Sequence, residues 1–117
     1  MTFDDVRQFT LSLPGVEEHL VFGEPTLKIG KRFLTCIAKI DADSLVVKVP
    51  DMLEIEFLIE TNPDIYYSPP HYANFKSVLV RLSKADPNEV YHLLERAWRF
   101  FAPKRVVAQW DKEKTGK

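Results

Sequence analysis

Lysine and arginine side chains gather on and beside two predicted β-hairpins, and they are the group best suited to bind a ligand. The six that share this position are Lys28, Lys31, Arg32, Lys48, Lys76 and Arg81. Cations at hairpin tips neutralise the phosphates of a nucleic acid while a strand or helix meets a groove. The same surface would be extended by Lys84, which follows the second hairpin, and by Arg96, Arg99, Lys104 and Arg105. The sequence therefore predicts a binding protein with DNA as its partner, held by two basic hairpins.

A second candidate site is the segment between the last two predicted strands, which is rich in proline and tyrosine. His71 lies in this segment, and Tyr66, Tyr67 and Tyr72 are close to it in sequence. Aromatic walls with few polar groups are typical of small-molecule pockets. The alternatives are a small-molecule cleft near His71 and a histidine that packs and bonds to the backbone. A third hypothesis is a protein-interaction module that uses a sheet edge or the last helix.

Residue types that commonly catalyse reactions are present, but not in the arrangements that catalysis requires. Cys36 falls in a continuous apolar stretch, which favours an inert core thiol over a nucleophile. His19, His71 and His92 do not share ligand spacing with carboxylates. The chain has no Gly-x-Ser-x-Gly elbow, no glycine-rich phosphate loop and no aromatic–basic interleaving of the RNA-binding kind. We therefore expect a non-enzymatic protein without a metal or a cofactor.

The charges are distributed unevenly along the chain. The formal net charge is −1, from 16 basic and 17 acidic residues, which is not the strongly basic balance of a typical DNA-binding domain. Residues 26–50 and 76–117 carry an excess of basic side chains, whereas residues 1–25 and 51–75 carry an excess of acidic ones. Two outcomes are open: the basic blocks form one positive face, or they scatter over a solvated surface.

Capping residues and apolar spacing predict four helices. The expected N-caps are Thr2, Asp51 and Asp86, and the expected stops are Pro14-Gly15, Asn62-Pro63 and Ala102-Pro103. The third helix has the clearest pattern, because apolar residues from Val90 to Phe101 recur at the spacing of one helical face. Val106, Val107 and Trp110 indicate a short final helix.

Apolar segments predict five strands, at residues 26–29, 33–40, 45–49, 65–67 and 75–82. Tight turns at residues 30–32 and 41–44 join the first three into an antiparallel meander, and the last two form a second hairpin. Glu17, Glu18 and His19 are assigned to a loop. Strands joined by short turns, with helices packed on them, define the α+β class. We therefore predict an α+β fold whose antiparallel sheet combines a three-strand meander with a second hairpin.

The length of 117 residues suits a single domain, which we place at residues 1–111 with a polar tail at residues 112–117. No apolar run approaches the roughly 20 residues that span a bilayer. The acidic N-terminal residues lack the features of a signal peptide. A single cysteine leaves no internal disulfide. These features predict a cytoplasmic protein without a membrane partner.

Several short motifs follow one another in a specific order and spacing. They are Leu13-Pro14-Gly15, Pro25-Thr26-Leu27-Lys28-Ile29-Gly30-Lys31, Leu45-Val46-Val47-Lys48-Val49-Pro50, Tyr67-Ser68-Pro69-Pro70-His71-Tyr72, Val78-Leu79-Val80-Arg81-Leu82, Ala97-Trp98 and Ala102-Pro103-Lys104-Arg105. This order resembles the YjbR/MmcQ family over residues 2–110. The resemblance implies a CyaY-like fold with two β-hairpin wings, a shape for which the family is described as DNA-binding. It also leaves open an auxiliary or resistance role, since the family's name partly comes from an antibiotic biosynthesis cluster.

Overall fold

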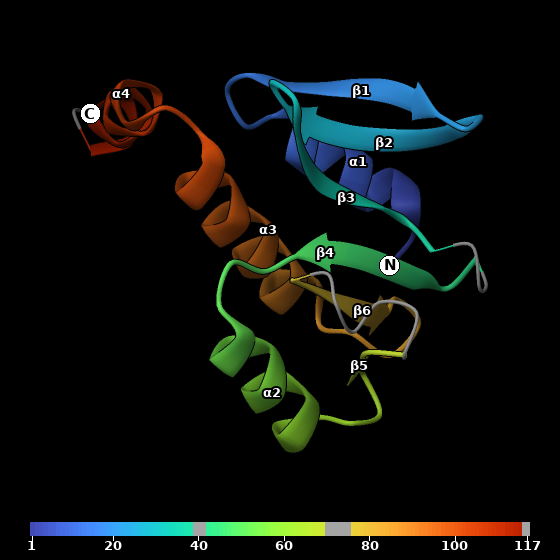
Figure 1. Ribbon diagram of the computed structural model, residues 1–117. Helices are drawn as coiled ribbons and strands as arrows, with labels where there is room; N and C mark the ends of the chain where they lie inside the picture. Colours follow the sequence, from blue (N-terminus) through green and yellow to red (C-terminus); the bar gives the residue numbers. More distant parts are fainter. Residues whose placement is uncertain (39–41, 70–75, 116–117) are drawn as a thin grey trace.

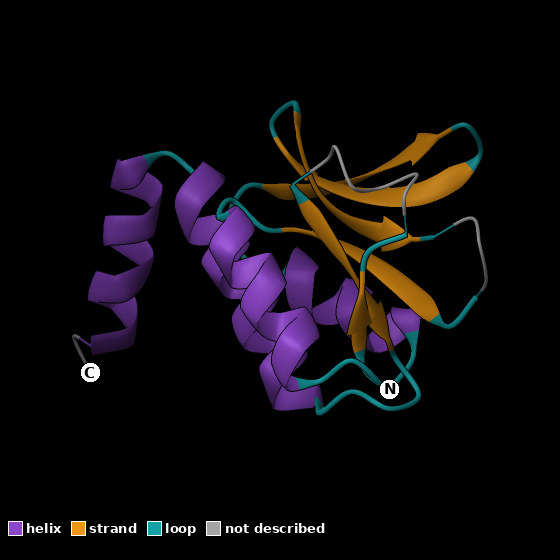
Figure 2. Ribbon diagram, turned by 60° about the horizontal axis from the view of Figure 1, so that its bottom comes forward, coloured by secondary structure: helices purple, strands orange, loops and turns teal. Residues whose placement is uncertain are grey.

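A six-stranded antiparallel sheet forms one side of the molecule, and the helices lie on the other side (Figures 1 and 2). The computed structural model describes residues 1–38, 42–69 and 76–115. The strands are β1 (Val16–Val21), β2 (Glu24–Ile29), β3 (Arg32–Ile37), β4 (Ser44–Lys48), β5 (Tyr66–Tyr67) and β6 (Ser77–Arg81). The helices are α1 (Phe3–Leu11), α2 (Met52–Thr61), α3 (Pro87–Phe101) and α4 (Lys104–Thr115). The strand order is β1-β2-β3-β4-β6-β5, and the predicted α+β class is confirmed.

The strand β1 forms where the sequence pattern indicates a loop, so this part of the prediction is wrong. It pairs with β2 along its whole length, from Val16 opposite Ile29 to Val21 opposite Glu24. Of its six residues only Val16 is buried. An edge strand that buries so little of its surface carries no apolar alternation by which to recognise it. The meander therefore has four strands, from β1 to β4, instead of three.

The register of the strands decides which side chains face the helices. Residues directly opposite each other on neighbouring strands share a face of the sheet. One row on the helix side consists of Leu27, Thr35, Val47 and Val78, and the adjacent row on the opposite face consists of Thr26, Cys36, Val46 and Leu79. Leu34 is an extra residue on β3, because Leu27 pairs with Thr35 while Lys28 pairs with Phe33. This bulge lets both Leu34 and Ile37 pack on the helix side.

The helix α3 supplies the apolar stripe against which the sheet packs. Asp86 caps it by accepting the amide of Asn88 at 2.9 Å, and Pro87 occupies the first turn, as predicted. The core that it forms with α1, α2 and the strands contains Val6, Leu45, Val47, Val49, Ile55, Tyr66, Val78, Val80, Leu82, Val90, Leu93 and Leu94. Every one of these side chains is almost completely buried, so the periodic pattern of α3 is a core pattern.

Trp98 closes a second core at the C-terminal end of α3. Its side chain is fully buried, and its indole N–H donates to the carbonyl of Pro14 at 2.8 Å. The buried residues around it are Leu13, Val16, Leu27, Ile29, Leu34, Ala97 and Ala102. Gly15 follows Pro14 with a φ of 82°, and a Cβ on it would lie 3.0 Å from the Ile29 side chain. The turn that presents the Pro14 carbonyl to Trp98 therefore requires glycine.

The helix α4 projects from the body of the molecule and is held by α3 (Figure 2). The Arg99 guanidinium donates two bonds to the Asp111 carboxylate, at 2.9 and 2.7 Å. The ring centroids of Trp110 and Trp98 lie 4.9 Å apart in an edge-to-face contact. α4 continues to Thr115, so residues 112–115 are helical where we expected the start of a polar tail.

We predict that Trp98→Phe lowers the free energy of unfolding by about 2–4 kcal/mol, because the smaller ring leaves a cavity and the Pro14 carbonyl loses its donor. Urea denaturation measures the change. Trp110→Phe is the matched control, since Trp110 is only half-buried, and we expect it to lower the free energy of unfolding by less than about 1.5 kcal/mol. Equal losses in the two variants would contradict a special role for Trp98.

We predict that α4 loosens from α3 in acid. The bonds from Arg99 hold the pKa of Asp111 below its ordinary value of 3.8. A carboxyl whose pKa is lower in the folded chain stabilises the fold fully above its unfolded pKa, and this contribution is lost as the pH falls through the folded pKa. Amide hydrogen exchange in α4 should therefore accelerate below about pH 4. Asp111→Asn should accelerate it already at neutral pH, whereas the control Glu113→Gln on the same helix should not.

Candidate nucleic-acid interface

The strand directions bring five of the six predicted cations to one end of the sheet, together with one more from α4. β2 ends there and β3 begins there, β4 ends there, and β6 starts beside β4 (Figure 1). The C-terminal end of α3 and the start of α4 lie at the same end, since Phe101 of α3 meets Arg32 of β3. We call this surface the basic end, and it consists of Lys28, Lys31, Arg32, Lys48, Lys76 and Lys104.

The cations of the basic end keep their charges available. Lys31, Arg32 and Lys76 are exposed, and Lys28 and Lys48 are half-buried. Within the ranges that the structure describes, no carboxylate lies at salt-bridge distance from any of them. Their nearest cross-strand neighbours differ, because Lys48 is opposite Ser77 whereas Lys28 is opposite Glu17. The carboxylate of Glu17 therefore offsets part of the field of Lys28, whereas no carboxylate lies directly opposite Lys48 on β6.

Arg81 does not belong to this surface. It is the last residue of β6 and pairs with Ser44, so it lies at the opposite end of the sheet from Lys76. Its guanidinium sits 4.0 Å from the centroid of the Tyr67 ring and is directed at the carbonyls of Pro63 and Asp64, each 3.4 Å away. The predicted strand at residues 75–82 includes Arg81, but the sequence pattern does not predict which end of the sheet Arg81 occupies.

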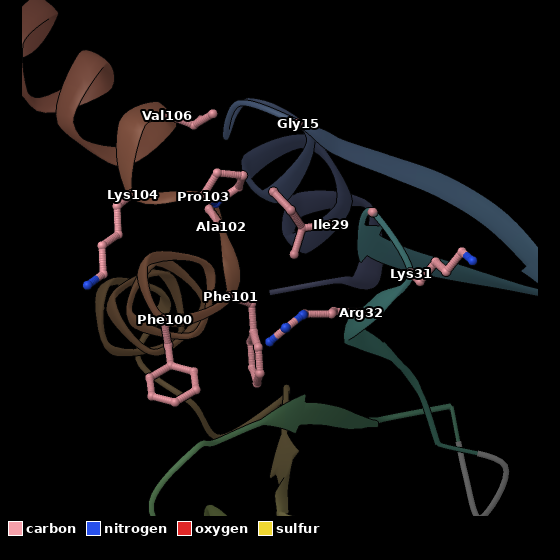
Figure 3. A pocket seen from close by; sticks show the side chains of 11 residues that line it. Gly15, Ile29, Lys31, Arg32, Phe100, Phe101, Ala102, Pro103, Lys104 and Val106 are labelled. Atoms are coloured by element: carbon pink, nitrogen blue, oxygen red, sulfur yellow. The ribbon is translucent and has the colours of Figure 1, made fainter.

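A cleft of about 700 Å³ opens at the basic end, between the β2–β3 turn and the junction of α3 with α4 (Figure 3). It is lined by Gly15, Ile29, Gly30, Lys31, Arg32, Phe100, Phe101, Ala102, Pro103, Lys104 and Val106. Its lining includes three cations and no carboxylate. The cleft between Pro50 and Arg99 contains the carboxylates of Asp51 and Glu54, and the one beside Trp110 contains that of Glu113. Among these, the cleft at the β2–β3 turn is the one suited to an anion.

Two aromatic rings stand beside the cations of this cleft. The Arg32 guanidinium points toward Phe101 and lies 5.5 Å from its ring centroid, while Lys31 points away from it (Figure 3). The Phe100 ring contacts Phe101 edge to face, with centroids 5.0 Å apart, and is 64% exposed. The sequence analysis missed this pairing of aromatic and basic side chains. The two groups come together only because the fold brings the end of α3 to the β2–β3 turn. The sequence does show that Phe100 lies outside the apolar stripe of α3, which is the one local sign of an exposed aromatic ring.

Two of the tyrosines predicted to line a cleft near His71 do not share a face of the sheet. Tyr66 and Tyr67 are consecutive in β5 and therefore point to opposite faces of the sheet. Tyr66 is buried in the core, where burial and the nearby Glu89 raise its pKa to about 12. Tyr67 contacts the hydroxyl of Ser44 and the guanidinium of Arg81 on the other face. His71 and Tyr72 lie outside the described residues.

The remaining candidates for chemistry are dispersed. Cys36 is half-buried and faces away from the helices, where it packs against a small cluster of Ala38, Val46 and Leu79, and not in the main core. His19 lies on β1 beside Glu17, and His92 is exposed on α3. In the part of the chain that is described, no three metal-binding side chains converge. No helix of that part has the length and apolar surface that crossing a bilayer requires.

Comparison with known proteins adds a family and a fold. The YjbR family model matches residues 11–100. Uncharacterized proteins of two mycobacteria, Mb2600 of Mycobacterium bovis and Rv2570 of Mycobacterium tuberculosis, are each 29% identical to this chain over 91% of its length and 92% of theirs. The crystal structure of Deinococcus radiodurans protein DR2400, from the family DUF419, superposes with a TM-score of 0.73 and 24% identity over 88% of this chain and 80% of that one. The family resemblance in the sequence motifs is therefore confirmed, and this chain belongs to the YjbR family.

Proposed function

We propose that this protein binds nucleic acid, with DNA as the first ligand to test, through phosphate contacts made by the basic end. The observation that supports the proposal is the convergence of Lys31, Lys48, Lys76 and Lys104 from four separate parts of the chain onto one end of the sheet. The charge of a cation without a carboxylate partner is not neutralised by the protein, so the whole charge attracts a phosphate. When the two bind, the counterion condensed on that phosphate is released, which favours binding. We place this activity in the cytoplasm, the compartment that the sequence predicts.

The proposal accommodates an acidic net charge. Non-specific affinity for DNA depends on the local contacts between cations and phosphates, and not on the sum of charges over the whole protein. The mycobacterial relatives are uncharacterized proteins, so the support comes from the arrangement of charges and not from kinship. The contacts in this arrangement are to the nucleic-acid backbone, and we therefore expect weak dependence on base sequence.

We predict that removal of two charges from the basic end, in Lys31→Gln/Lys76→Gln, weakens DNA binding several-fold at about 50 mM salt. Each lost phosphate contact should also reduce the slope of log affinity against log salt by about 1. Fluorescence anisotropy with a labelled random-sequence DNA, at two salt concentrations, measures both quantities. Both lysines are exposed, so the fold should be unaffected, and thermal unfolding checks this.

The matched control is Lys84→Gln/Lys112→Gln. It removes the same charge from exposed positions outside the basic end, in the β6–α3 turn and on α4. We expect it to change the affinity less than twofold. Equal weakening by the two double variants would show diffuse attraction and contradict an interface at the basic end. Absence of binding by the unmodified protein at about 50 mM salt, where phosphate contacts are strong, would overturn the proposed function.

A further inference from the structure

The cleft at the basic end pairs a cationic lining with an exposed aromatic ring, and this combination selects a particular form of nucleic acid. On the basis of the proposed function, we propose that the cleft binds single-stranded nucleic acid, with an unpaired base stacked on Phe100 and the adjoining phosphates held by Arg32 and Lys104. Single-strand binding sites commonly combine a positive groove with aromatic side chains on which bases stack.

Phe100 supplies the stacking surface. Its side chain is 64% exposed at the last turn of α3, whereas the next residue, Phe101, is half-buried against Trp98 and its neighbours. An exposed phenylalanine gives up roughly 1.5–3 kcal/mol that burial would provide, so its position at the mouth of a cleft favours a ligand that covers it. A planar base covers such a ring well, and every base has a face with which to do so.

The charges on one side of Phe100, in the cleft at the β2–β3 turn, favour an anion next to that base, whereas the cleft on its other side contains Asp51 and Glu54. Arg32 and Lys104 line the cleft from two sides, one from the β2–β3 turn and the other from the start of α4, and Arg32 points toward Phe101 while Lys104 points away from Arg32 (Figure 3). The contact of Arg32 with the Phe101 ring holds its guanidinium at the cleft and leaves its N–H groups for a phosphate. Since no carboxylate lines the cleft, a phosphate bound there meets no opposing charge from the lining.

The same features argue against a duplex in the cleft. In a duplex each base face is covered by the next base pair, so Phe100 reaches a base only by wedging a step apart, which costs a few kcal/mol. A single strand offers its base faces without that cost, and each stacked base contributes about 1–3 kcal/mol. The basic end as a whole attracts either form through phosphates, whereas the aromatic cleft discriminates in favour of the unpaired one.

The test compares two phenylalanines with nearly equal exposure. Phe100→Leu removes the aromatic face at the cleft, and Phe57→Leu removes one on α2, where Phe57 is 63% exposed and lines a different cleft. Anisotropy is measured with a labelled oligothymidylate of about 15 nucleotides, within the site sizes of known single-strand modules, and with a duplex of equal length. An oligouridylate arm distinguishes RNA from DNA.

We predict tighter binding of the single strand than of the duplex by the unmodified protein. Phe100→Leu should weaken single-strand binding by roughly 5- to 150-fold, the equivalent of one lost base stack, and change duplex binding less than twofold. Phe57→Leu should leave both unchanged. Equal effects of the two substitutions, or equal affinity of the unmodified protein for both forms, would overturn the single-strand proposal while nucleic-acid binding stands. No binding of either form at about 50 mM salt would overturn the proposed function itself.

Discussion

The hydrogen bond from the buried Trp98 indole to the Pro14 carbonyl is the constraint on which the rest of the structure depends. It joins residues 84 positions apart in the chain and lies in the core where the turn after α1, the first three strands and the end of α3 meet. A buried carbonyl without a donor is costly, so the bond favours a single placement of α3 against the β1–β3 strands. That placement sets Phe100 and Phe101 beside Arg32. The cleft at the basic end is therefore a consequence of how the core closes.

Local signals predicted most of the fold because they act over a few residues. The side chains of the predicted caps Thr2, Asp51 and Asp86 each accept a hydrogen bond from a backbone N–H in the first turn of the helix. The apolar stripe predicted for α3 is the face that packs in the core. β1 escaped prediction because its stability comes from pairing with β2 and not from its own burial. The turn that joins these two strands carries only part of a hairpin signal, because Gly23, with a φ of 82°, is not preceded by asparagine, aspartate or glycine. Phe22 adopts a φ of 53° there, a conformation in which turns usually have asparagine or glycine.

The candidate site required information that local patterns do not contain. Alternation within a strand indicates which face a side chain takes, and it correctly separates Tyr66 from Tyr67 once β5 is known. The end of the sheet at which a cation lies depends on strand direction and order, which are set by long-range pairing. Lys76 immediately precedes β6 and Arg81 is its last residue, so the two cations lie at opposite ends of the sheet. Grouping the cations by hairpin therefore combined Arg81 with cations that lie at the other end of the sheet. Grouping them by the end of the sheet at which they lie defines one surface.

Strand direction also resolves the apparent conflict between an acidic protein and an anionic ligand. The end of the sheet opposite the basic end carries the carboxylates of Asp4, Asp5, Glu24, Asp43, Asp64 and Asp86, at the start of α1 and in the turns next to β2, β4, β5 and α3. The molecule measures 41 × 33 × 26 Å along its principal axes, whereas the screening length at physiological ionic strength is about 8 Å. The acidic end therefore contributes little repulsion to an anion at the basic end. The net charge of −1 sums over the whole chain, whereas a bound phosphate responds to the local charges, which are the cations of the basic end and the nearby carboxylate of Glu17 opposite Lys28.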